Sequence, residues 1–67
     1  LGIAAGVRDA EVEVTVYDAA ARRVIAGTVA LDSRGYGTLN VSALAPGTYT
    51  LVLEAPGLSE NGSFVKR

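Results

Sequence analysis

Apolar and polar residues alternate along much of this chain, most clearly from Glu11 to Tyr17. In an extended chain, the side chains of Val12, Val14 and Val16 lie on one side, and the glutamate and threonine side chains lie on the other. Because successive residues of a β-strand point to opposite faces, the pattern predicts a strand with one buried and one exposed face.

Other runs rich in apolar and β-branched residues predict further short strands. These runs are Arg23–Leu31, Gly37–Val41, Thr48–Ala55 and Ser63–Lys66, with a weaker one at Leu1–Val7. Between them we expect type II turns at Pro46-Gly47 and Pro56-Gly57, and a tight turn at Asn61-Gly62. The spacing of strands and turns is typical of a small all-β sandwich or barrel.

Two segments leave alternatives open. The alanines between Asp18 and Arg23 favour helix, but so few residues are too short for a stable one, and we expect a hairpin connection with at most one helical turn. In Arg23–Leu31, Val24 and Ala26 belong to a second, fairly apolar face. That face is expected to be covered either by a partner or by the other sheet.

The composition narrows the classes of function. A chain of 67 residues forms one domain, residues 1–67, and buries only about 60% of its unfolded surface. It has no Cys, His or Met, so disulfides and soft-metal sites are excluded, and association with a partner is the remaining source of added stability. A net charge of −1 without basic runs argues against nucleic acid, and apolar runs far shorter than about 20 residues argue against a membrane span.

The acidic residues give little support to catalysis or metal binding. Glu11 and Glu13 would lie about 7 Å apart on one strand face, near the separation of an inverting glycosidase pair, but an exposed face does not raise either pKa. Asp9, Asp18 and Asp32 lack the density of a calcium loop and suit turn capping better. We therefore expect no catalytic residue, no metal ligand and no cofactor.

Three segments carry a resemblance to a known family. These are Val16–Val24, which contains Tyr17-Asp18 and Arg22-Arg23, then Val41–Leu51, which contains Leu44-Ala45-Pro46-Gly47-Thr48-Tyr49, and finally Phe64–Arg67. Together they resemble the C-terminal sorting domains of type IX secretion substrates of Bacteroidota-type bacteria. Ala21 stands where that family prefers Gly, and the Leu44–Tyr49 part is also similar to carboxypeptidase-regulatory-like and prealbumin-like sandwiches.

The resemblance implies an immunoglobulin-like antiparallel β-sandwich of about six or seven short strands. It also implies export to the cell surface or the extracellular space, with recognition of the final strand by secretion machinery. Tyr49 is expected to be structural, with its ring in the core and its hydroxyl tying down the preceding connection, and Leu44, Pro46 and Gly47 to shape that connection.

Three functions remain as hypotheses, and the leading one is a non-catalytic exported subunit of a filament or surface layer. Its segment Leu1–Val7 would be donated to a neighbouring copy by β-strand addition, giving a homo-oligomer or polymer. The residues expected to mediate assembly are Leu1, Ile3, Val7, Phe64 and Val65.

The second hypothesis is a sorting or anchoring module, and the third is an accessory domain that binds protein or a surface glycan. Tyr36 and Tyr17 are the aromatic residues open to a glycan. Asn40 and Asn61 each begin an Asn-x-Ser triplet, which is the acceptor pattern for glycosylation.

Overall fold

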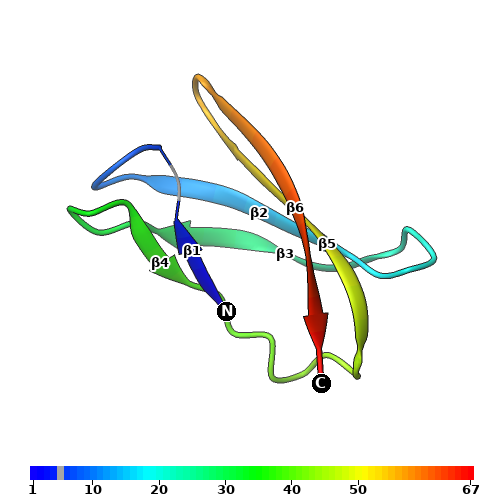
Figure 1. Cartoon of the computed structure of the whole chain (residues 1–67). Helices are drawn as coiled ribbons and strands as arrows, with labels where there is room; N and C mark the ends of the chain where they lie inside the picture. Colours follow the sequence, from blue (N-terminus) through cyan, green and yellow to red (C-terminus); the bar gives the residue numbers. More distant parts are fainter. Residues whose placement is uncertain (5) are drawn as a thin grey trace.

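Six β-strands make up the regular structure of the residues described by a computed structural model, 1–4 and 6–67. They are β1 (Gly2–Ala4), β2 (Glu11–Tyr17), β3 (Arg23–Ala30), β4 (Tyr36–Thr38), β5 (Gly47–Ala55) and β6 (Leu58–Lys66). One sheet has the order β3-β2-β5-β6 and the other pairs β1 with β4, and every pairing is antiparallel. The prediction of a small all-β antiparallel sandwich is confirmed (Figure 1).

The core forms on the inner face of the larger sheet. Strand β2 lies in its middle, and Val12, Val14 and Val16 are at most 1% exposed because β3 and β5 flank them and the smaller sheet contributes to the same core. The remaining buried hydrophobic residues of the described chain come from both sheets and their connections. They are Ile3, Val29, Leu31, Tyr49 and Leu53.

The N-terminal strand is paired within its own chain. Ile3 of β1 lies opposite Gly37 of β4 and is buried in the core. The ammonium group of Leu1 donates to the carbonyl of Leu39 at 2.9 Å, and the N–H of Leu39 donates to the carbonyl of Leu1 at 2.8 Å. Residue 5 of the proposed donor segment lies outside the described residues.

Gly37 permits a close approach between the two sheets. A Cβ built on it would lie 2.8 Å from the carbonyl oxygen of Ala30 and 2.6 Å from a methyl carbon of Val29. Both distances are shorter than a carbon atom tolerates, so a residue without a side chain is required where β4 passes β3.

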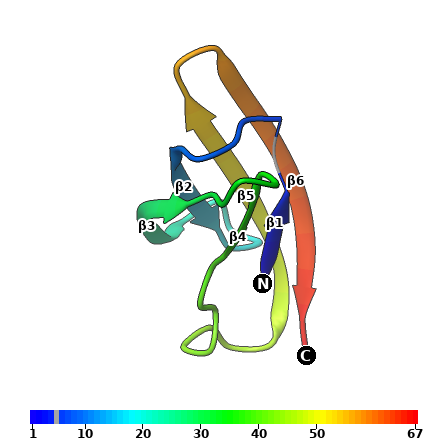
Figure 2. The same cartoon turned by 90° about the vertical axis from the view of Figure 1, so that its left-hand side faces the viewer.

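The expected turn at Asn61-Gly62 is wrong. Strand β6 runs straight through it, with Asn61 opposite Val52 and Gly62 opposite Leu51. The chain reverses earlier, at Pro56-Gly57, where Pro suits the first central position of a type II turn and Gly57 has a φ of 76°. The long β5–β6 hairpin that results extends beyond the other strands (Figure 2).

The type II turn expected at Pro46-Gly47 is also wrong. The positive glycine φ values in the described chain belong to Gly35 and Gly57, whereas Gly47 already begins β5 and pairs with Lys66. The turn in this connection comes earlier, where the N–H of Leu44 donates to the carbonyl of Val41 at 3.0 Å.

The remaining strand boundaries differ from expectation by a few residues. Strand β4 covers Tyr36–Thr38 rather than 37–41, and the weak strand expected at 1–7 is reduced to Gly2–Ala4. Both are short because they pair only with each other, so neither has a longer neighbour to extend its ladder of hydrogen bonds.

Candidate functional site

The three segments that carry the resemblance meet at one end of the larger sheet. Because β2 and β6 both run antiparallel to β5, the ends of β2 and β6 lie beside the start of β5. Tyr17 therefore lies opposite Thr50, and Lys66 opposite Gly47. We call this end, formed by residues 17–22, 41–50 and 64–67, the motif end.

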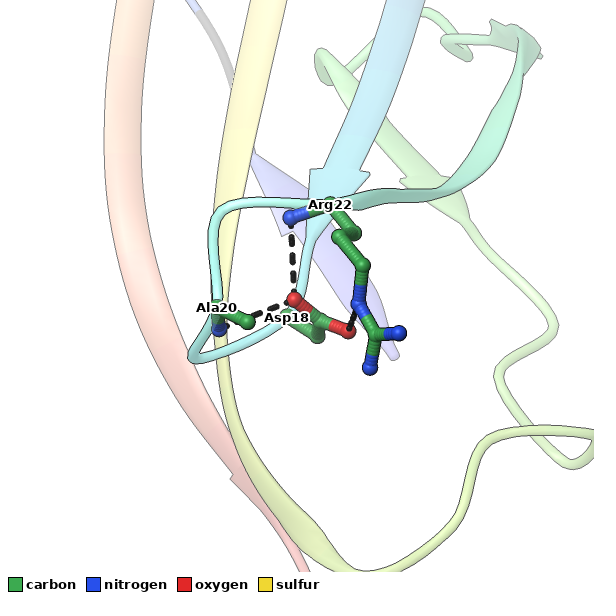
Figure 3. Close-up of polar contacts among 3 residues, drawn as sticks. All are labelled: Asp18, Ala20 and Arg22. Carbon is green, nitrogen blue, oxygen red and sulfur yellow. Dashed lines mark hydrogen bonds and ion pairs between the residues drawn. The ribbon is translucent and has the colours of Figure 1, made fainter.

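Asp18 organises the hairpin between β2 and β3. Its Oδ1 accepts hydrogen bonds from the N–H groups of Ala20 and Arg22, both at 2.9 Å, and its Oδ2 accepts one from Nε of Arg22 at 3.1 Å (Figure 3). Of the interactions that lower the pKa of Asp18, the hydrogen bond from the backbone N–H of Arg22 has the largest effect. The expected hairpin connection is thus held by a side chain and needs no helical turn.

Ala21 completes this hairpin in the left-handed region. Its φ is 62°, and its N–H donates to the carbonyl of Asp18 at 2.9 Å. A turn followed by one left-handed residue is a common three-residue hairpin loop, and glycine is favoured at that last position. This geometry explains why glycine suits the position that Ala21 occupies here.

Tyr49 ties the β4–β5 connection to the sheet. The side chain is 7% exposed, its hydroxyl donates to the carbonyl of Ala45, and its ring stacks on Phe64 with the ring centres 5.4 Å apart. Nζ of Lys66 donates to the carbonyl of Val41 at 3.3 Å. The connection is therefore held from both β5 and β6, in the arrangement known as a tyrosine corner.

An open depression of about 480 Å³ lies on the outer face of the motif end. One wall comes from the β2–β3 hairpin and the other from β5, whose Thr50 lies opposite Tyr17. The lining residues are Tyr17, Asp18, Ala19, Ala21, Thr48, Thr50 and Val52. The site offers an aromatic ring, methyl groups and threonine hydroxyls next to one carboxylate, which suits contact with a protein surface.

Sequence reasoning found only part of this depression. It named Tyr17 as accessible and placed Asp18 and Thr48 in motifs, but it did not bring them together with Thr50 and Val52. Alternation along β5 does place Thr50 and Val52 on the face opposite Leu51. The missing information was that β2, rather than another strand, is the neighbour of β5.

The residues expected to mediate assembly do not form one surface. Ile3 is buried, and Val7 and Phe64 pack against the core, so these side chains are already used within the chain. Leu1 is partly exposed, and Val65 is 62% exposed next to Thr48 of the depression. Of these residues, Val65 is the one that borders the candidate site.

The other candidate residues are spread over the surface. Asn40 and Asn61 are both exposed, and Oδ1 of Asn40 accepts a hydrogen bond from the N–H of Ser42 at 2.9 Å. Tyr36 is 54% exposed but belongs to the smaller sheet, so it does not share a strand platform with Tyr17. Within residues 1–4 and 6–67, no cluster of three or more carboxylates is placed to hold a metal ion.

Among the described residues, no helix has the length and apolar character needed to cross a membrane.

Comparison with known proteins assigns the chain to a family. No curated protein and no solved structure matches the chain. The family model described as "Secretion system C-terminal sorting domain" matches residues 1–67, which is the whole sequence. The chain therefore belongs to this family of sorting domains, whose type IX members are secreted and reach the cell surface or the extracellular space.

Proposed function

We propose that this domain acts as a non-catalytic sorting signal, recognised by type IX secretion machinery at its motif end. The observation that carries the proposal is the family match over residues 1–67, which includes each of the three segments that converge there. Folding brings these segments, far apart in sequence, together at one end of the larger sheet, so the proposed signal is a folded shape rather than a linear peptide.

The contacts of the motif end support a role as a rigid recognition surface. Asp18 fixes the hairpin wall of the depression, and Tyr49 fixes the start of β5, which forms the other wall. Since both walls are held before a partner arrives, binding loses little conformational entropy. The exposed Val65 extends this surface onto the final strand, the element through which the family resemblance implied recognition.

The sorting role is preferred to the filament subunit that the sequence placed first. The family match points to interaction with secretion machinery, and nothing comparable supports a polymer made by strand exchange. The strand that would be donated, β1, already pairs with β4 of its own chain. Donation would require breaking that pairing and removing Ile3 from the core.

The proposal is tested by transferring residues 1–67 to a passenger that is normally retained in the periplasm of a bacterium with type IX secretion. Passenger outside the outer membrane is expected with the domain and absent without it. Val14→Asp places a charge in the core and unfolds the domain, so export should be lost. Retention of the wild-type fusion, or undiminished export of the unfolded variant, would contradict recognition of a folded signal.

A further inference from the structure

Strand β6 leaves one edge of the larger sheet open. In the order β3-β2-β5-β6 it lies last, and β5 is the strand that contacts it in the described chain. The other edge strand, β3, is interrupted by a register shift at Val16 and Tyr17 of β2, and β4 passes close to the carbonyl of Ala30. Proteins commonly protect an edge by such devices or with proline, and β6 has none of them from Leu58 to Lys66. Its edge is therefore free to pair with another strand.

The strand register shows which backbone groups of β6 point away from the sheet. The N–H of Leu31 donates to the carbonyl of Ala10, so even-numbered residues of β2 direct their backbone groups to β3 and odd-numbered ones to β5. Following the pairing across the sheet, even-numbered residues of β5 face β2, and even-numbered residues of β6 face β5. The odd-numbered residues of β6 therefore present their N–H and C=O groups at the open edge. These residues are Ser59, Asn61, Ser63 and Val65.

Two opposite charges lie at equal distances from the middle of this edge. Glu60 comes three residues before Ser63, and Lys66 comes three residues after it. Both side chains project from the inner face of the sheet, since Glu60 lies opposite the buried Leu53 and Lys66 alternates along β6 with the same period. The ion pair found among the described residues is Arg22 with Asp18, so Glu60 has no cation within ion-pair distance there. The strand is thus complementary in charge to a reversed copy of itself.

We propose that two copies of this chain pair antiparallel through the open edges of β6, with a two-fold axis that passes beside Ser63 normal to the sheet. This axis places the copies side by side and joins their four-stranded sheets into one. Ser63 then lies opposite Ser63, and Asn61 of each copy lies opposite Val65 of the other. The three central pairs exchange about six backbone hydrogen bonds. The assembly closes at two copies, because the same edge is used twice.

The side chains select both a second copy and this register. Glu60 of each copy lies opposite Lys66 of the other, at a pair without backbone hydrogen bonds, where cross-strand side chains approach most closely. Phe64 of each copy lies opposite Gly62 of the other, which has open space where a Cβ would be, so the ring can cover the glycine. Moving the axis by one residue in either direction separates Glu60 from Lys66 and loses both ion pairs.

The dimer would also affect the proposed recognition site. Val65 borders the depression at the motif end, and its backbone is paired with Asn61 of the other copy in the dimer. Dimer formation and recognition of the final strand would then compete. This consequence rests on the proposed function, whereas the dimer itself does not.

Sedimentation velocity of the 67-residue chain over a concentration series tests the dimer. Because one strand from each copy makes the contact, we expect monomer and dimer in exchange between about 10 µM and 1 mM chain. Ser63→Pro removes the outward N–H at the axis but no hydrogen bond to β5, and proline is tolerated at such an edge position. It should raise the dissociation constant at least tenfold, whereas the control Ser63→Ala keeps the N–H and should dimerise like the wild type.

Charge reversal tests the register and does not depend on how well proline is tolerated. Glu60→Lys and Lys66→Glu should each raise the dissociation constant at least tenfold, because each replaces two attractive contacts by two repulsive ones. Mixed together, the two variants should form a heterodimer, since each then meets opposite charges. Glu11→Lys makes the same charge change on β2, away from the edge, and should dimerise like the wild type.

Amide hydrogen exchange locates the contact. The N–H groups of Asn61, Ser63 and Val65 should gain protection as the chain concentration rises, whereas those of Gly62 and Phe64 are already directed to β5 and should be protected throughout. A monomer up to about 1 mM, growth beyond two copies, a dimer that Ser63→Pro leaves intact, or no association of the mixed charge variants would each overturn the proposal. Protection gained on another strand instead would also overturn it.

Discussion

The carboxylate of Asp18 accepts two hydrogen bonds from Arg22, one from the backbone N–H at 2.9 Å and one from Nε at 3.1 Å (Figure 3). The first fixes the path of the hairpin, and the second keeps the arginine side chain beside the turn. The guanidinium is mostly exposed, so the ion pair adds little stability and the bond to the backbone dominates.

Asp18→Ala should therefore lower the thermal midpoint more than Asp18→Asn. The amide oxygen of Asn can still accept the hydrogen bonds from Ala20 and Arg22, whereas Ala accepts none. Thermal unfolding, monitored by circular dichroism, gives the thermal midpoints of the wild type, Asp18→Asn and Asp18→Ala, which should fall in that order. Equal midpoints for the two variants would show that charge, rather than the turn geometry, is what Asp18 contributes.

Ala21→Gly should stabilise the domain by about 0.5–1 kcal/mol. Ala21 has a φ of 62°. This conformation is strained for an L-residue with a Cβ atom but not for glycine. Ala19→Gly is the matched control, because the φ of Ala19 is not positive, and it should destabilise slightly. Urea unfolding gives both free energies. A destabilised Ala21→Gly would contradict the left-handed geometry of this hairpin.

Tyr49→Phe should cost about 1–2 kcal/mol in free energy of unfolding. The variant keeps the stacking on Phe64 but removes the hydroxyl and leaves the carbonyl of Ala45 without that donor. Tyr36→Phe changes the same atom on a side chain that is 54% exposed, and it should be nearly neutral. Similar losses in the two variants would argue against the tyrosine corner.

Gly37→Ala should destabilise the domain by about 1–3 kcal/mol, because the added methyl would overlap the carbonyl of Ala30. Gly2 lies one pair away in the same small sheet and has open space for a Cβ, so Gly2→Ala is the control. Hydrogen exchange should show loss of protection in β1 and β4 for the first variant only. Normal protection in Gly37→Ala would contradict the close approach of β4 to β3.

Stability should fall as the pH drops below the normal range of aspartate titration. The hydrogen bond from the backbone N–H of Arg22 lowers the pKa of Asp18 below the ordinary value for an aspartate. The hydrogen bonds from the backbone N–H groups of Tyr36 and then Arg34 do the same for the pKa of Asp32. Since these folded-state values lie below those of the unfolded chain, the unfolded chain binds more protons in this window. The two ionised carboxylates contribute their full stabilisation above the pKa that they have in the unfolded chain. This stabilisation is lost as the pH falls through the lower pKa that they have in the folded chain.

Urea midpoints measured from neutral pH down to about pH 3 test this dependence. The double variant Asp18→Asn with Asp32→Asn should flatten the lower part of the profile, because neither turn then carries a titrating acceptor. An unchanged acid slope in that variant would assign the pH dependence to other carboxylates.

The fold was predictable where one face of a strand is buried. The alternation around Val12, Val14 and Val16 defined β2, because each valine is in the core. The turn predicted at Asn61-Gly62 did not form, because the local turn preference of these residues is weaker than the strand register set by the two-residue turn at Pro56-Gly57. Local preferences of this size are commonly overridden by strand pairing.

The candidate site was predictable only in pieces. The motifs placed Asp18 and Tyr49 in turn and corner roles, but the depression depends on Tyr17 lying opposite Thr50, which is a contact between distant parts of the chain. Alternation shows which face a residue occupies and does not show which strand lies beside it. That pairing had to come from the structure.

Export of a passenger carrying Thr50→Arg, compared with Ser59→Arg, tests most directly whether the motif end is recognised. Both residues are exposed on the outer face of the larger sheet, but Thr50 lines the depression and Ser59 lies near the opposite end. We predict that Thr50→Arg loses export while its circular dichroism spectrum and thermal midpoint stay normal, and that Ser59→Arg is exported like the wild type. Wild-type export of Thr50→Arg would contradict recognition at this site.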